Sequence, residues 1–78
     1  MMPTVTVSVY ANLRDYTDGQ STVPLDLPTG ATIRMVIDRL GIPLEQTRII
    51  FVDHRAAGLE HVLGGGERID LFSAIGGG

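Results

Sequence analysis

The residues best suited to chemistry stand at the C-terminal end of the sequence, where Ile75 is followed by three glycines, Gly76, Gly77 and Gly78. Glycine lacks a Cβ, so a run of glycines forms a thin, flexible strip of backbone that is costly to order. Such a strip can enter a narrow channel in another protein and present the carboxylate of Gly78 there. The alternative is a frayed terminus without a function. These residues alone leave both interpretations open.

Other residues give weaker signals for chemistry. His54 and His61 are seven positions apart with no paired carboxylate at ligand spacing, so we expect no metal site. The glycines at 64–66 lack the following Lys and Ser or Thr of a phosphate-binding loop, which predicts a turn. Asp53 and Asp70 are expected to be solvated or to cap turns.

Composition narrows the class of protein. A chain of 78 residues forms one domain and buries only roughly 60% of its unfolded surface, so an internal active-site cavity and an enzyme activity of its own are not expected. Cysteine is missing, which is compatible with a reducing cytoplasm. The net charge is −3 and the six basic residues, all arginine, are scattered, which argues against nucleic-acid binding. No apolar stretch approaches the ~20 residues of a membrane span, so we expect a cytoplasmic protein.

Two strands are predicted in the N-terminal third of the chain. Residues 3–10 alternate between valine and polar side chains, as a half-buried strand does. A second strand is expected over residues 21–27, where Pro24 suits an edge position because proline cannot donate to a ladder. The residues between them, 11–20, are rich in turn formers and should form an exposed connection, with Leu13 packing back.

A short helix follows. Four apolar residues at helical spacing share one of its faces: Ile33, Val36, Ile37 and Leu40. Thr32 stands at the N-cap position, where its hydroxyl could accept from first-turn amides. Gly41 is the expected stop, in a left-handed conformation. Because a helix this short is unstable alone, its apolar stripe must lie on a sheet.

The C-terminal half supplies the remaining strands. The apolar run within residues 48–53 predicts a central strand covered on both faces. Leu59, Val62 and Leu63 form a small apolar cluster that could be a helical turn. The last strand is expected over residues 67–72, with Phe72 as the only large apolar side chain on its polar side.

This order of elements predicts an α+β roll of the ubiquitin-like, β-grasp kind. We expect a mixed sheet of four to five strands with one main helix packed across it. The first and last strands should lie side by side at the centre. Residues 1–73 would form the β-grasp domain, and residues 74–78 a flexible glycine tail at one end of the sheet.

The sequence resembles the small ubiquitin-like sulfur carriers of the MoaD and ThiS type, across nearly its whole length. The matching stretches are VTVSVYANLRDY from Val5 to Tyr16, PTGATIRMVIDRLGIP from Pro28 to Pro43, and the stretch from Ile49 to the end. The most specific element is the position of Gly77 six residues after Leu71, the spacing at which members of this family end.

The resemblance implies a sulfur carrier without an active site of its own. An adenylating enzyme similar to those that activate ubiquitin would use ATP to adenylate the Gly78 carboxylate. Sulfur from a donor would then replace AMP, giving a thiocarboxylate for a synthase of the molybdopterin or thiamine type. Gly77 would provide clearance in the enzyme's channel. Partner binding would involve Phe72, Ile75 and Gly76; the chain itself would bind no cofactor and no metal.

Two other functions share the same features. A protein modifier would form an isopeptide bond between Gly78 and a lysine of a target. A ubiquitin-like interaction module would not use its glycines at all. For Phe72, simple packing against a neighbouring side chain is the alternative to a role in partner binding.

Overall fold

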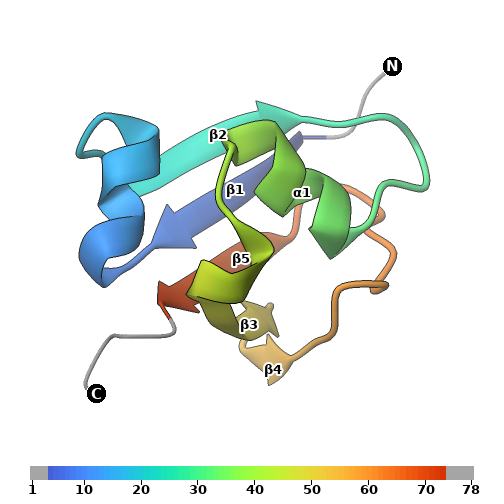
Figure 1. The fold of residues 1–78 in the computed structure, drawn as a ribbon. Coiled ribbons are helices and arrows are strands. Elements are labelled where there is room, and N and C mark those ends of the chain that lie inside the picture. Colours follow the sequence, from blue (N-terminus) through green and yellow to red (C-terminus); the bar gives the residue numbers. More distant parts are fainter. Residues whose placement is uncertain (1–3, 74–78) are drawn as a thin grey trace.

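The computed structural model describes residues 4–73 (Figure 1). In order, the elements of this part of the chain are β1 (Thr4–Val9), the 3-10 helix η1 (Ala11–Thr17), β2 (Thr22–Asp26), α1 (Ile33–Leu40), the 3-10 helix η2 (Leu44–Gln46), β3 (Thr47–Val52), β4 (Arg55–Ala56) and β5 (Arg68–Ser73). The four longer strands and the helix that the sequence predicts agree with these bounds to within one residue.

The strands form one mixed sheet in the order β2-β1-β5-β3-β4. β1 and β5 run parallel at its centre, and the other three pairs are antiparallel. The predicted α+β roll, with the first and last strands side by side, is therefore confirmed. Pro24 lies in the edge strand β2, where its missing N–H breaks no internal ladder.

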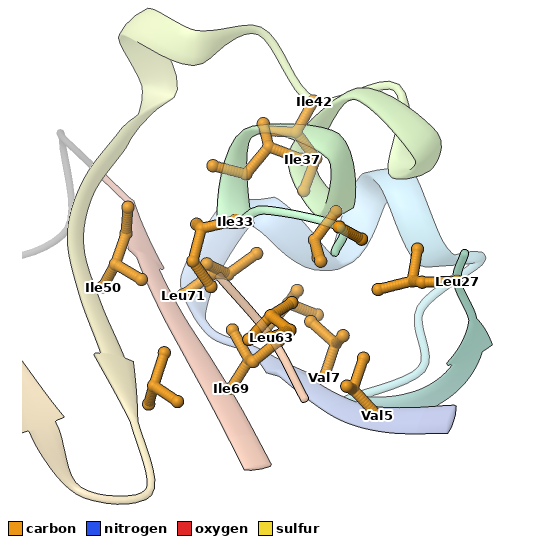
Figure 2. Close-up of a cluster of buried hydrophobic side chains, with 14 of the residues drawn as sticks. Val5, Val7, Leu27, Ile33, Ile37, Ile42, Ile50, Leu63, Ile69 and Leu71 are labelled. Carbon is orange, nitrogen blue, oxygen red and sulfur yellow. The ribbon is translucent and has the colours of Figure 1, made fainter. Parts of the chain in front are cut away.

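α1 lies across one face of the sheet and buries its apolar stripe there (Figure 1). Ile33, Val36 and Ile37 are fully buried. Figure 2 shows Ile33 and Ile37 of this stripe in one cluster with side chains of the sheet, among them Val5, Val7, Ile50, Ile69 and Leu71. The helix ends at Gly41, whose φ of 77° is the left-handed conformation that the sequence predicts.

The first turn of α1 is capped differently from the prediction. Thr32 is the N-cap residue, but its hydroxyl makes no capping hydrogen bond. The backbone N–H of Ile33 donates instead to the carbonyl oxygen of His61 at 3.1 Å, and that of Arg34 to the carbonyl oxygen of Leu59 at 2.9 Å. A distant loop therefore satisfies the amides that a helix start leaves without partners.

The prediction that β3 is covered on both faces is wrong. Ile50 and Val52 point into the core and are buried, whereas Ile49 is 49% exposed and Phe51 is half-buried. α1 covers one face of the sheet, and no other element within residues 4–73 covers the opposite face of β3 in the same way (Figure 1). Along the uninterrupted apolar run, residues that face the core thus alternate with residues that face the surface.

Two connections also differ from expectation. Residues 11–17 form a 3-10 helix instead of an irregular exposed segment, although Leu13 is fully buried as predicted. The apolar cluster around Leu63 forms no helical turn. Leu63 is buried, but Val62 is 61% exposed and pairs with Thr32 in an isolated β-bridge. This bridge holds the loop that caps α1.

We predict that Ile37→Ala lowers the free energy of unfolding by about 2–5 kcal/mol, because it empties a fully buried site. Met35→Ala on the same helix removes a side chain that is 41% exposed and should cost less than about 1 kcal/mol. Urea unfolding of both variants measures the difference. Equal losses would contradict the assignment of the helix face.

Candidate functional site

The face of the sheet opposite α1, called here the open face, carries apolar side chains from several strands at one end. The antiparallel register pairs Phe72 with Ile49 and Asp70 with Phe51. The parallel register pairs Asp70 with Ser8 on β1. Because side chains alternate along a strand, these residues all belong to the face away from the core. The register therefore gathers apolar groups of β3 and β5 near the end of β5.

Tyr10, which follows β1, completes this group. Its ring stacks on the ring of Phe72, with centroids 4.5 Å apart and an interplanar angle of 5°. Phe51 meets Phe72 edge-on, with centroids 5.8 Å apart and an angle of 87°. We call Tyr10, Ile49, Phe51 and Phe72 the open-face patch. Its three aromatic residues are half-buried, so Phe72 packs against neighbours and still presents surface.

A carboxylate lies beside the open-face patch. The Tyr10 hydroxyl donates to Oδ1 of Asp70 at 2.9 Å, and Nε of Arg68 lies 3.4 Å from the same oxygen. The Asp70 side chain is only 8% exposed, so the prediction of a solvated Asp70 is wrong. It is buried although none of the helices within residues 4–73 lies on this face. Asp70 therefore depends on these two partners for its hydrogen bonds.

Arg68 and His54 contribute to the rim of this surface. The side chains of Tyr10 and Asp70 raise the pKa of Arg68, so its guanidinium stays charged. His54 occupies the two-residue turn between β3 and β4 in the left-handed conformation, with φ of 69°. A shallow hollow on the open face is lined by Tyr10, Phe51, His54, Arg68, Asp70 and Phe72.

The open-face patch borders the point from which the chain continues toward its last residues. β5 ends at Ser73, directly after Phe72. Ile75, Gly76, Gly77 and Gly78 lie outside the described residues, so the roles given to them remain predictions. The division into residues 1–73 and 74–78 remains a prediction as well.

The glycines at 64–66 form the predicted turn. The carboxylate of Glu67 accepts hydrogen bonds from the N–H groups of Gly64 and Gly65, each at 2.7 Å. Partial burial works to raise the pKa of Glu67, but these hydrogen bonds from backbone N–H groups together outweigh burial, and the pKa is lowered. These amides, which a phosphate would need, are already bound to a side chain of the protein.

The part of the chain from residue 4 to residue 73 contains no group of three or more His, Asp or Glu side chains that could hold a metal ion. His54 and His61 line different hollows of the surface. None of the helices described in this range is long and apolar enough to span a membrane.

Sequence reasoning identified Phe72 as a candidate for partner binding, but it missed Tyr10 and Asp70. A signal was present for both. Tyr10 continues the polar alternation of the first strand, and Asp70 precedes Phe72 by two positions, which places each on the outer face. The sequence predicted that the first and last strands lie side by side, but not the register that brings Tyr10 against Phe72 and Asp70.

A protein family described as Mut7-C ubiquitin matches residues 2–74 of the chain. A comparison with curated proteins finds no match.

Several solved structures have the same fold. Small archaeal modifier protein 1 of H. volcanii gives a TM-score of 0.74 at 20% identity, covering 90% of this chain and 95% of that one. A putative molybdopterin converting factor subunit 1 from Pyrococcus furiosus gives 0.78 at 20% identity, with coverage of 94% and 99%. A chain of the BexX/CysO complex of Amycolatopsis orientalis gives 0.68 at 25% identity, with coverage of 95% and 99%. The predicted ubiquitin-like β-grasp fold is confirmed.

We predict that Glu67→Gln lowers the free energy of unfolding at pH 7 by about 0.5–1 kcal/mol, because a charged acceptor at an exposed turn is replaced by a neutral one. The pKa of Glu67 is lower in the folded than in the unfolded chain, so its contribution is complete above the unfolded pKa of about 4.5. It is lost as the pH falls from there through the folded pKa.

Urea unfolding of both proteins between pH 7 and pH 3 measures this effect, and the two stability curves should converge at the acid end. Glu45→Gln, at an exposed position of η2, is the matched control and should change stability by less than about 0.5 kcal/mol at pH 7. A gap between wild type and Glu67→Gln that stays constant down to pH 3 would exclude this role of the Glu67 charge.

Proposed function

Since the chain belongs to the Mut7-C ubiquitin family, we propose that it is a ubiquitin-like carrier whose Gly78 carboxylate is activated by a partner enzyme and converted to a thiocarboxylate. The protein then donates sulfur to a synthase of the molybdopterin or thiamine type. In this proposal the chain holds no active site. Its β-grasp domain binds the partners, and residues 74–78 carry the reacting group.

The observation that carries the proposal is the position of Phe72, within the open-face patch and six residues before Gly78. Residues 74–78 span at most roughly 17 Å when extended, at 3.3–3.6 Å per residue. An enzyme that holds Gly78 must therefore contact the domain close to the end of β5. The surface available there is aromatic, half-exposed and bordered by Arg68.

Energetics favour such a docking surface. Ordering a glycine strip costs on the order of 1–2 kcal/mol per residue, which contacts of the tail alone offset poorly. Contacts between the partner and the open-face patch compensate for this cost, because aromatic side chains dominate many interfaces. Gly77 matters for a different reason, since any side chain there would crowd a channel built for bare backbone.

The proposed chemistry follows from the carboxylate. One Gly78 oxygen attacks the α-phosphate of ATP on the enzyme, pyrophosphate leaves, and an acyl-adenylate forms. Hydrosulfide supplied by a sulfur donor then displaces AMP from the acyl-adenylate, and loss of the proton from sulfur leaves a C-terminal thiocarboxylate. The names of two structural neighbours, a molybdopterin converting factor subunit and a complex that contains CysO, support partners of this general kind.

A protein modifier is the second candidate, because a structural neighbour is named a small archaeal modifier protein. A plain interaction module is the third, and it is favoured by the family match, which ends at residue 74 and does not include the last glycines. Both alternatives keep the same docking surface. They differ from the carrier in the fate of Gly78.

Intact mass spectrometry of the protein from its native host separates these functions. A carrier shows a form that ends at Gly78 with one sulfur in place of one oxygen. A modifier shows conjugates of higher mass that release this chain on cleavage of an isopeptide bond. A chain that extends beyond Gly78, or carries neither change, would exclude both and leave the interaction module.

We predict that Gly77→Val lowers activation at least tenfold, measured as ATP–pyrophosphate exchange by the adenylating enzyme of the same organism, because the new side chain obstructs the channel. Gly58→Val is the matched control. Gly58 lies in an exposed loop where an added Cβ meets nothing within 4 Å, so exchange should be unchanged. Wild-type exchange rates for Gly77→Val would refute a narrow channel.

A further inference from the structure

We propose that Asp70 is a positioning residue: through the Tyr10 hydroxyl it holds the Tyr10 ring flat against Phe72 and so fixes the surface that the activating partner recognises. This inference rests on the proposed function for the identity of the partner. The arrangement of the side chains does not depend on it.

The burial of Asp70 is unusual for its place in the fold. Asp70 lies on the open face of a central strand, where a carboxylate would ordinarily remain in water. Its side chain is nevertheless only 8% exposed, and the polar contacts to it come from Tyr10 and Arg68. Burying a carboxylate is costly unless its hydrogen bonds are made, so the carboxylate holds its partners in place.

Tyr10 is hydrogen-bonded to β5 through both its backbone and its side chain. Its backbone N–H donates to the carbonyl oxygen of Leu71 at 3.2 Å, and its hydroxyl donates to Asp70 at 2.9 Å. The ring spans the distance between these two hydrogen bonds and lies against Phe72. It cannot turn away from Phe72 without breaking the hydrogen bond to Asp70.

Phe72 is thereby enclosed on two sides. The Tyr10 ring covers one of its faces, and Phe51 meets it edge-on from β3. An anchor residue that is already held in one orientation loses less freedom when a partner binds. Asp70 thus favours recognition without contacting the partner or the reacting carboxylate.

Tyr10→Phe tests the proposal, because it removes the hydroxyl and keeps the ring. In the protein alone, nuclear Overhauser contacts between the rings of residues 10 and 72 should weaken. In ATP–pyrophosphate exchange with the adenylating enzyme of the same organism, KM for the variant should rise about three- to tenfold while kcat stays within about twofold. If Asp70 and Tyr10 only stabilised the fold, a folded variant would show no rise of KM at constant kcat.

Asp70→Asn and Asp70→Ala complete the series. Asparagine keeps an oxygen that can accept from Tyr10, so ring contacts and KM should remain close to wild type, whereas alanine should reproduce the Tyr10→Phe defect. Thr4→Val is the matched control, since it removes a 2.6 Å side-chain hydrogen bond to Asp26 on the same sheet, away from the patch. It should leave both measurements unchanged.

Unchanged ring contacts and unchanged KM in Tyr10→Phe would overturn the proposal, and so would an equal rise of KM in Thr4→Val. If the wild-type protein supports no exchange at all, the function proposed above fails. The ring contacts of Tyr10→Phe and Asp70→Asn then still decide whether Asp70 positions Phe72.

Discussion

The parallel pairing of β1 with β5 is the interaction on which the rest of the structure depends. It joins the beginning of the domain to its end and places Val7 opposite Ile69 and Val9 opposite Leu71, all fully buried. β2 is attached to one side of this pair and β3 to the other. Without it, the molecule would separate into two antiparallel units, neither of which could bury the apolar stripe of α1.

The same pairing determines what the opposite face presents. Because the two strands run in the same direction, their C-terminal residues lie at the same end of the sheet. Tyr10 meets Phe72 there. Thr4 begins β1 at the other end of the sheet (Figure 1). The open-face patch therefore lies at the end of the sheet where β5, and with it the described part of the chain, comes to its last residue, Ser73.

Much of the fold could be predicted from local patterns. The period-two alternation of β1 and the helical spacing of Ile33, Val36 and Ile37 are each decided within a few residues. The wrong predictions concern contacts between segments that are far apart in the sequence. Thr32 was expected to cap α1, but carbonyls of the loop at 59–61 do so.

In the candidate site too, features of the local sequence could be predicted and contacts between distant segments could not. Phe72 was recognisable as an aromatic side chain on the polar side of its strand, whereas the run that contains Ile49 and Phe51 was predicted to be covered on both faces. The exposure of Ile49 could not be read from the run that contains it, because an apolar residue on an open face has the same side chain as one in a core. The burial of Asp70 depends on Tyr10, which lies sixty positions earlier and becomes its neighbour only through the parallel ladder.

The edges of the sheet bear on how such a protein behaves at high concentration. At one edge, β2 carries Pro24, which offers no N–H to an incoming strand; at the other, β4 has only two residues, and β3 is irregular between Thr47 and Ile49. An extended segment of another molecule therefore finds no long, regular edge to join. The domain is in this way protected from polymerising edge to edge with copies of itself.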